Sequence, residues 1–389
     1  MQYNFDKIID RTHTNCVKLE KLKPLFGRND LIPLWVADMD FLSPPAVTNV
    51  LKQRVEHGLF GYTVATDDYF NSITGWLKRR HNWSVKKEEI TFVPGVVKGF
   101  AFAMDVFTKK GDKVIIQPPV YHPFRLVTEA LEREIVNNPL ILENGQYKMD
   151  FDGLREILAE NTCKMLILCN PHNPGGRVWI PEELRKLAEI CYDNDVLVVS
   201  DEIHSDLALP GYIHTPFATV SQKAEANSLT LMAPSKTFNI AGLVSSFAVI
   251  HNEAIREKYV RFLEPRELNQ ATVFALTATC AAYNECDDWL NQLIDYLQDN
   301  IDFVDNYLKE NIPQIKAIVP QASFLIWLDC RELNLPQNEL VKLFVDEAHL
   351  ALNNGTIFGI EGKGFMRLNV GTSRVIIEKA LDNLKKVIY

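Results

Sequence analysis

Four polar segments follow apolar runs in the middle of the chain, and each carries a side chain that can do chemistry. They are Tyr121-His122 after Lys113–Ile116, Asn170–Gly176 after Lys164–Cys169, Asp201–Asp206 after Val196–Ser200, and Ser235-Lys236 after Leu229–Met232. An aromatic ring, an amide, a carboxylate and an amine together suit the binding of a planar cationic ring. Each of them alone is an ordinary loop residue, since a single lysine is most often solvated.

Lys236 stands just past a buried apolar run, where open α/β sheets bind ligands beyond the carboxyl ends of their strands. A desolvated lysine amine has a lowered pKa and can form a Schiff base. Asp201 could keep a pyridine nitrogen protonated, and its alternative role is to cap the turn that follows. Pyridoxal phosphate (PLP) needs these two groups and an anion site. The sequence therefore predicts a PLP site at these strand ends.

Three further residues are candidates for contact with the cofactor ring. Asn173 could donate to its phenolic oxygen, or could simply form the turn in Asn-Pro-His-Asn-Pro-Gly-Gly. His204, three residues after Asp201, could reach the same oxygen or be a core histidine. Tyr121 could stack on the ring, and it could equally be a packing tyrosine.

Two segments could bind anions. Pro94-Gly95-Val96-Val97 places a glycine turn before a predicted helix, and the free N–H groups at a helix start suit a phosphate. Such turns are common, so this signal is weak alone. Arg367 lies inside the apolar run Phe-Met-Arg-Leu-Asn-Val, where its charge needs a partner. We expect this partner to be the α-carboxylate of a substrate, and the alternative partner is an Asp or Glu side chain of the same protein.

Strands and helices alternate from about residue 90 to 250, which predicts an α/β fold with a mostly parallel central sheet. The chain is mainly helical from Asn252 to about Asn311, and short strands then reappear before a closing helix at Ser373–Val387. We expect three parts: an N-terminal segment 1–45 that packs with the small domain, a large cofactor-binding domain 46–285, and a smaller α+β domain 286–389.

Composition excludes several classes of function. The 389 residues carry a net charge of −9 with a pI near 5.6, which argues against nucleic acid or an anionic membrane as the partner. No apolar run approaches the ~20 residues of a membrane span, and no signal peptide is evident. The seven cysteines are scattered without zinc-ligand spacing, so we expect reduced thiols, no metal and a cytoplasmic protein.

Nine segments in order carry a family resemblance over nearly the whole chain. They are NFDKIIDR, LWVADMDF, FGYT, VPGVVKG, QPPVYHPF, NPHNPGGRVW, SDEIHSD, APSKTFNIAGL and FMRLNVGTSR. The chain resembles the class I and II aminotransferase-like PLP enzymes of fold type I, which have the aspartate aminotransferase-like fold. WVADMDF, His172, His204 and APSKTFN make it most similar to the MalY/PatB branch of cystathionine β-lyases.

The resemblance implies roles for individual residues. Lys236 would bind the cofactor covalently and act as the α-proton base, with Asp201 on the pyridine nitrogen. The other implied contacts are Asn173 and His204 at the phenolic oxygen, Tyr121 on the ring, Val96 and Val97 on the phosphate, Arg367 on the substrate carboxylate, and Asp38 near the substrate. Tyr62 would reach the phosphate of a neighbouring subunit, which implies a homodimer with shared active sites.

Two positions depart from many relatives, which carry Ser and Arg on the phosphate where this chain has Ala233 and Val244. Main-chain groups, Ser235 and Tyr62 are then expected to hold the phosphate. The resemblance implies a carbon–sulfur β-lyase that cleaves cystathionine or other S-substituted cysteines to a thiol, pyruvate and ammonia. A class I/II aminotransferase and a PLP-binding regulatory protein are the alternatives.

Overall fold

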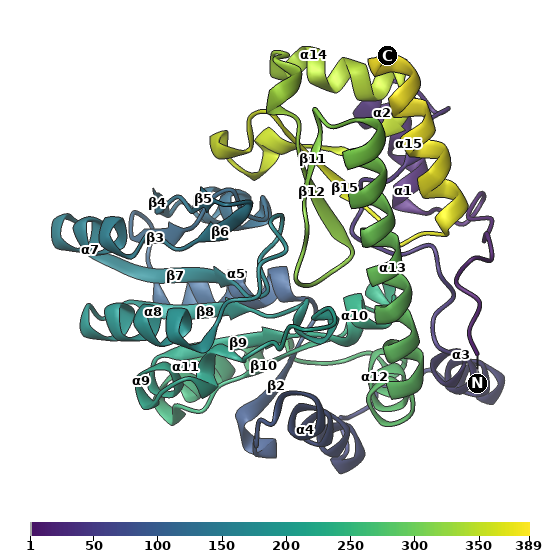
Figure 1. Cartoon of the computed structure of the whole chain (residues 1–389). Coiled ribbons are helices and arrows are strands. Elements are labelled where there is room, and N and C mark those ends of the chain that lie inside the picture. The colour runs from purple at the N-terminus through teal and green to yellow at the C-terminus, as the bar shows by residue number, and fades with distance from the viewer. Residues whose placement is uncertain (1) are drawn as a thin grey trace.

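A seven-stranded sheet forms the core of the larger part of the computed structural model, which describes residues 2–389 (Figure 1). Its strand order is β2-β10-β9-β8-β7-β3-β4. The strands are β2 (Ile90–Val93), β3 (Lys113–Ile116), β4 (Glu134–Asn137), β7 (Cys163–Cys169), β8 (Leu197–Asp201), β9 (Ser228–Met232) and β10 (Ser246–Val249). Every pairing is parallel except those of β10 with β2 and β9. The predicted α/β class with a mostly parallel sheet is confirmed.

The reversed direction of β10 matters for the site. Because β10 alone runs against the other six strands of this sheet, its first residues lie at the edge where those strands end. The segment that begins with Ser245-Ser246 therefore meets the residues that follow β2, β8 and β9.

Helices cover both faces of the sheet, as the nearly continuous apolar character of its strands requires. On one face lie α5 (Val96–Phe107), α6 (Pro123–Ala130) and α11 (Glu253–Leu263), and on the other α7 (Phe151–Glu160), α8 (Pro181–Asp193) and α9 (Gln222–Ala226). Within β7, Met165 and Ile167 pack on the first face and Leu166 and Leu168 on the second. This alternation follows the two-residue period of a strand.

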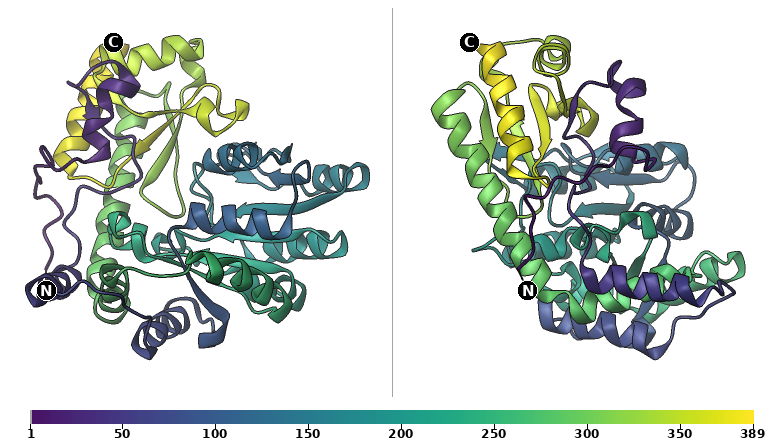
Figure 2. Two further views of the ribbon diagram at one scale, coloured as in Figure 1. Left: turned by 180° about the vertical axis from the view of Figure 1, so that it is seen from behind. Right: turned by 90° about the vertical axis from the view of Figure 1, so that its right-hand side faces the viewer.

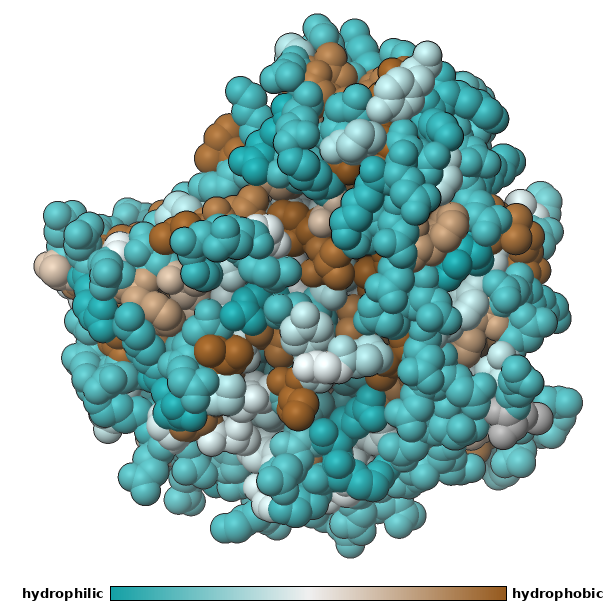
Figure 3. All heavy atoms as spheres, viewed as in Figure 1, coloured by the Kyte–Doolittle hydropathy of each residue, from teal (hydrophilic) through white to brown (hydrophobic). Residues whose placement is uncertain are grey.

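The C-terminal part forms a second, smaller layer of sheet and helices. Its sheet has the order β11-β12-β15-β14, built from β11 (Lys316–Ile318), β12 (Leu325–Asp329), β14 (Asn353–Asn354) and β15 (Phe365–Asn369). The long helix α13 (Asp287–Asn311) runs from the large part to the small one, where α15 (Arg374–Ile388) packs along it (Figures 1 and 2). In Figure 3 apolar side chains, shown in brown, gather in the hollow between the two parts.

The N-terminal segment returns to the C-terminal part of the chain. β1 (Ile32–Pro33) pairs in parallel with β13 (Leu350–Ala351). We keep the division into 1–45, 46–285 and 286–389 as a proposal, which this pairing and the start of α13 at Asp287 support.

The remaining elements lie around these two sheets. They are α1 (Val17–Glu20), α2 (Leu22–Phe26), α3 (Pro45–His57), α4 (Asp67–His81), β5 (Ile141–Glu143), β6 (Gln146–Lys148), α10 (Pro234–Thr237), α12 (Val273–Glu285) and α14 (Gln337–Lys342). None of the helices in the described chain combines the length and apolar character that crossing a bilayer requires.

Candidate active site

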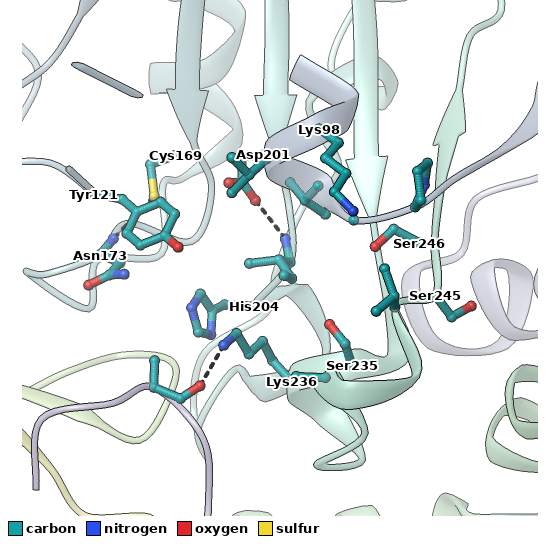
Figure 4. Close-up of a pocket in the computed structure, with 18 residues that line it drawn as sticks. Lys98, Tyr121, Cys169, Asn173, Asp201, His204, Ser235, Lys236, Ser245 and Ser246 are labelled. Atoms are coloured by element: carbon teal, nitrogen blue, oxygen red, sulfur yellow. Dashed lines mark hydrogen bonds between the residues drawn. The ribbon is translucent and has the colours of Figure 1, made fainter. Parts of the chain in front are cut away.

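A cavity of about 280 Å³ lies at the carboxyl edge of the large sheet (Figure 4). Eight of the residues predicted from the sequence line it: Val96, Val97, Tyr121, Asn173, Asp201, His204, Ser235 and Lys236. They come from five separate stretches of chain, because parallel strands bring their carboxyl ends to one edge. Folding thus assembles most of the predicted site in one place.

Lys236 lies in α10, the short turn that follows β9. Its Nζ donates to the carbonyl oxygen of Ala37, and no carboxylate of the described chain forms an ion pair with it. Burial lowers the pKa of this amine to about 8, while the negative charge of Asp38 partly opposes the shift. The neutral amine that a nucleophile or proton acceptor needs is therefore more populated near neutral pH than in a solvated lysine.

Asp201, the last residue of β8, is 4% exposed. Burial raises the pKa of its carboxyl group to about 7, although the N–H of Ile203 donates to Oδ1 at 3.2 Å. Within residues 2–389 no cation pairs with it. A protonated ring nitrogen in the cavity would supply the missing positive charge.

His204 and Tyr121 lie on the same cavity as Asp201. The Nδ1 of His204 is buried without a partner among the described residues. Burial, with the charges of Lys236 and Arg367, lowers the pKa of this histidine to about 3, so the ring is neutral. Burial raises the pKa of Tyr121 to about 12. Both rings are neutral groups that could contact an aromatic ligand.

Arg367 is buried in β15, and its Nη1 donates to Asn173 Oδ1 at 3.0 Å. Its Nη2 donates to the carbonyl oxygen of Trp35 at 3.0 Å and also to Asn353 Oδ1. No Asp or Glu of the described chain pairs with it, and Nε has no partner. The internal ion pair, the alternative that the sequence left open, is thus absent from residues 2–389.

Asp38 lies outside the cavity that holds Lys236. Its Oδ2 accepts from Arg11 at 2.7 Å, and the amine of Lys18 lies 3.1 Å from Oδ1. These two cations outweigh burial and lower the pKa of its carboxyl group. The structure therefore places Asp38 in an ion-pair cluster of the N-terminal segment, near enough to affect Lys236 electrostatically.

Tyr62 also lies outside this cavity, and its side chain is fully exposed. It belongs to the stretch Leu59–Val64 between α3 and α4, which exposes several apolar side chains. No side chain or backbone group of residues 2–389 forms a hydrogen bond with its hydroxyl group, so a role for Tyr62 requires another molecule.

The lining residues fit the predicted cofactor. Asp201 offers an uncompensated carboxylate to a ring nitrogen, and His204 offers an unpartnered ring nitrogen. At the other end α5 begins after Gly95, whose φ of 115° suits glycine alone. No side chain caps this helix, so the N–H groups of Val96 and Val97 remain available to a phosphate.

A comparison with protein families agrees with this geometry. The model of the family described as aminotransferase class I and II matches residues 29–384. The chain belongs to this family. The match covers the cavity residues and Arg367 alike.

Named relatives of this aminotransferase-family chain include carbon–sulfur lyases. It is 44% identical to cystathionine β-lyase PatB of Bacillus subtilis over 98% of this chain and 99% of PatB. It is 33% identical to protein MalY of Escherichia coli, over 98% of each. Cystalysin from Treponema denticola, whose structure contains pyridoxal 5'-phosphate, matches with a TM-score of 0.95 at 35% identity, covering 100% of this chain and 99% of cystalysin.

Sequence inspection missed several residues that line the cavity of this family member. They are Ala37, Lys98, Cys169, Ala241, Ser245 and Ser246. Ser245 and Ser246 stand at the start of an apolar strand, which draws attention only once β10 is known to be antiparallel. Lys98 follows Val97 directly, and its position in the first turn of α5 was an available signal.

Proposed function

We propose that this protein is a PLP-dependent carbon–sulfur β-lyase that acts on cystathionine or a related S-substituted cysteine. One observation supports both the cofactor and the chemistry. The same cavity holds Asp201, which has no ion-pair partner within residues 2–389, and the amine of Lys236, whose pKa is lowered. The extent of the similarity to cystathionine β-lyase PatB supports elimination as the reaction.

Lys236, Asp201, Asn173 and His204 would hold the cofactor ring, with Tyr121 against its face and Val96, Val97 and Ser235 toward the phosphate. When bound, PLP supplies a cationic ring that withdraws electrons from the amino acid's Cα. Asp201 would stabilise that positive charge, because no cation within residues 2–389 forms an ion pair with its carboxylate. The neutral His204 adds a polar contact without a competing charge.

Arg367 would bind the substrate α-carboxylate. Its guanidinium group is buried, lacks a carboxylate partner in residues 2–389, and is held in place by Asn173 and the carbonyl of Trp35. A bidentate pair with a carboxylate satisfies such a group better than any neutral acceptor. This salt bridge would fix the orientation of the substrate Cα relative to the Lys236 amine.

Lys236 is the base in this proposal. Its neutral amine takes the proton from Cα, the electrons of that bond form a Cα–Cβ double bond, and the Cβ–S bond breaks to release a thiolate. A thiol with a pKa near 8.5 is a good leaving group at neutral pH. The ammonium group of Lys236 then gives this proton to the departing thiolate, and water hydrolyses the unsaturated amino product to pyruvate and ammonia.

The proposed partner is a second copy of this chain. Leu59 is 67% exposed, Phe60 55% and Val64 76%, an apolar stretch that water solvates poorly. Tyr62 stands within this stretch, so a homodimer would cover the stretch and carry the tyrosine to the neighbouring subunit's phosphate. We also propose a cytoplasmic location, which the seven free cysteines favour.

The experiment is to incubate the purified protein with cystathionine in the absence of any 2-oxo acid. Equal amounts of thiol, pyruvate and ammonia, in large excess over protein, are expected. Transfer of one amino group per protein molecule without thiol release would instead indicate an aminotransferase. Binding without any conversion would indicate a PLP-binding regulator.

A further inference from the structure

The end of the cavity next to α5 differs chemically from the end next to Asp201. Asp201 lies on β8, whereas Ser246 lies on β10, two strands away in the same sheet. Two strand spacings separate them by about 10 Å. Asp201 is the only carboxylate among the described residues that line the cavity. The α5 end therefore carries no negative side chain.

Unsatisfied polar groups converge on that end. Ser246 is 1% exposed and Ser235 is 7% exposed as whole residues, and neither hydroxyl group forms a hydrogen bond within residues 2–389. Both line the cavity, together with Val96 and Val97 at the uncapped start of α5. Buried hydroxyl groups and free helix N–H groups are donors, and an anion is the ligand that satisfies them.

Lys98 is the cation at this end. It stands in the first turn of α5 and lines the same cavity, and Figure 4 shows its side chain on the same side as Ser246. Its amine forms no ion pair or hydrogen bond within residues 2–389. Lys236 is the other lysine of the lining, but its amine is directed to the carbonyl of Ala37.

The neighbouring loop supplies no charge. Val244 lines the cavity with a φ of 55° and an apolar side chain, so the loop after Lys236 contributes only hydroxyl groups. Ser245 already shares a hydrogen bond of 2.7 Å with Thr279. A phosphate monoester carries close to two negative charges at neutral pH, which a helix terminus of about half a charge does not balance.

We propose that Lys98 is the charge partner of the cofactor phosphate. It would supply the positive charge that the apolar side chain of Val244 does not. This inference rests on the proposed PLP function. Lys98 contacts the phosphate with its amine, and Ser235, Ser246 and the first turn of α5 supply the neutral donors. Lys98 then affects how tightly the cofactor is held and takes no part in proton transfer.

Lys98→Met in the full-length protein, stripped of cofactor, tests the inference. Equilibrium dialysis would compare PLP with pyridoxal, which lacks the phosphate, and inorganic phosphate would serve as a competitor. Loss of a charge-assisted hydrogen bond should weaken PLP binding roughly tenfold or more and leave pyridoxal binding unchanged. Inorganic phosphate should compete with PLP less well in Lys98→Met than in the wild type. Lys98→Arg, which keeps the positive charge, should restore PLP binding.

Lys258→Met is the matched control, because Lys258 is exposed on α11, outside the cavity, and has no ion pair in the described chain. PLP binding by Lys98→Met at the wild-type level would overturn the inference. Equal loss of PLP and pyridoxal would also overturn it, since Lys98 would then act through the fold. A wild-type protein that binds neither molecule would overturn the proposed function itself.

Discussion

Arg367 and Asn173 join the two parts of the molecule at the site: Nη1 of the arginine donates to Oδ1 of the asparagine at 3.0 Å. The arginine comes from β15 of the small sheet and the asparagine from the loop that follows β7 of the large one. This contact connects the residue proposed to bind the substrate carboxylate with one proposed to bind the cofactor. Any change in how the two parts sit would therefore alter both contacts together.

Arg367→Lys should lower kcat/KM for an amino-acid substrate by about ten- to hundredfold, mainly through KM, because one ammonium cannot replace a bidentate guanidinium group. Steady-state kinetics measure the change. For an α-carboxamide analogue of the substrate, which lacks the negative charge, the same substitution should lower kcat/KM far less. Arg185→Lys on the exposed face of α8 is the control. Equal losses for both substrates would contradict the carboxylate role.

Asp201 should make the stability of the cofactor-free protein depend on pH. Its pKa is raised to about 7 in the folded protein, whereas the unfolded carboxyl group releases its proton near pH 4. The folded state holds the extra proton between these values, so this group's contribution to stability falls as pH rises through the window, by up to about 1.4 kcal/mol per unit.

Asp201→Asn mimics the protonated group and removes this slope. Urea unfolding of both proteins at several pH values from 4 to 7 measures the effect. The variant should gain stability relative to the wild type as pH rises. A difference that stays constant over the window would show that Asp201 ionises normally.

Tyr62 should act in the partner's site, which mixed dimers can reveal. Tyr62→Ala and Lys236→Ala should each lower activity strongly, and co-expression of the two should restore part of it. One site of the mixed dimer then has both Lys236 and the partner's Tyr62. If Tyr62 served its own subunit, no site would be intact, and the mixture would stay as inactive as the single variants.

Thr237 should hold the Lys236 turn in place. Its hydroxyl group donates to Asp206 Oδ2 at 2.9 Å, and Oδ1 of the same buried carboxylate accepts from Trp76 at 2.9 Å. Thr237→Val removes a hydrogen bond to a charged acceptor and should lower the free energy of unfolding by about 1.5–3 kcal/mol. Thr74→Val, at an exposed hydrogen bond of α4, is the control. Equal effects of the two substitutions on denaturant midpoints would refute the anchoring role.

Much of the site could be predicted because its chemistry lies at strand ends. Lys236, Asp201 and Asn173 each follow an apolar run, and a parallel sheet brings such ends together. Ser246 begins its strand instead, so only the antiparallel direction of β10 places it there. That direction depends on tertiary pairing and leaves no local pattern in the sequence.

Asp38 shows a second limit. Its place near the substrate stays a prediction, but the sequence did not predict its ion-pair partners, Arg11 and Lys18, which lie twenty or more positions earlier in the chain. Ion pairs of this kind depend on how an irregular segment wraps, and no periodicity predicts them. The edge strand β4 and the hairpin β5–β6 were likewise not predicted, because their strands are short and half exposed.

The central claim is that Lys236 carries the cofactor, and its most direct measurement is the mass of the peptide that contains it. Borohydride reduction of the PLP-loaded protein fixes the carbon–nitrogen bond between lysine and cofactor, and digestion then locates the added mass. The account predicts one reduced pyridoxyl phosphate per chain, on Lys236, and none in Lys236→Ala. The label on another lysine, or an unlabelled Lys236 peptide from protein that retains its visible absorbance, would contradict it.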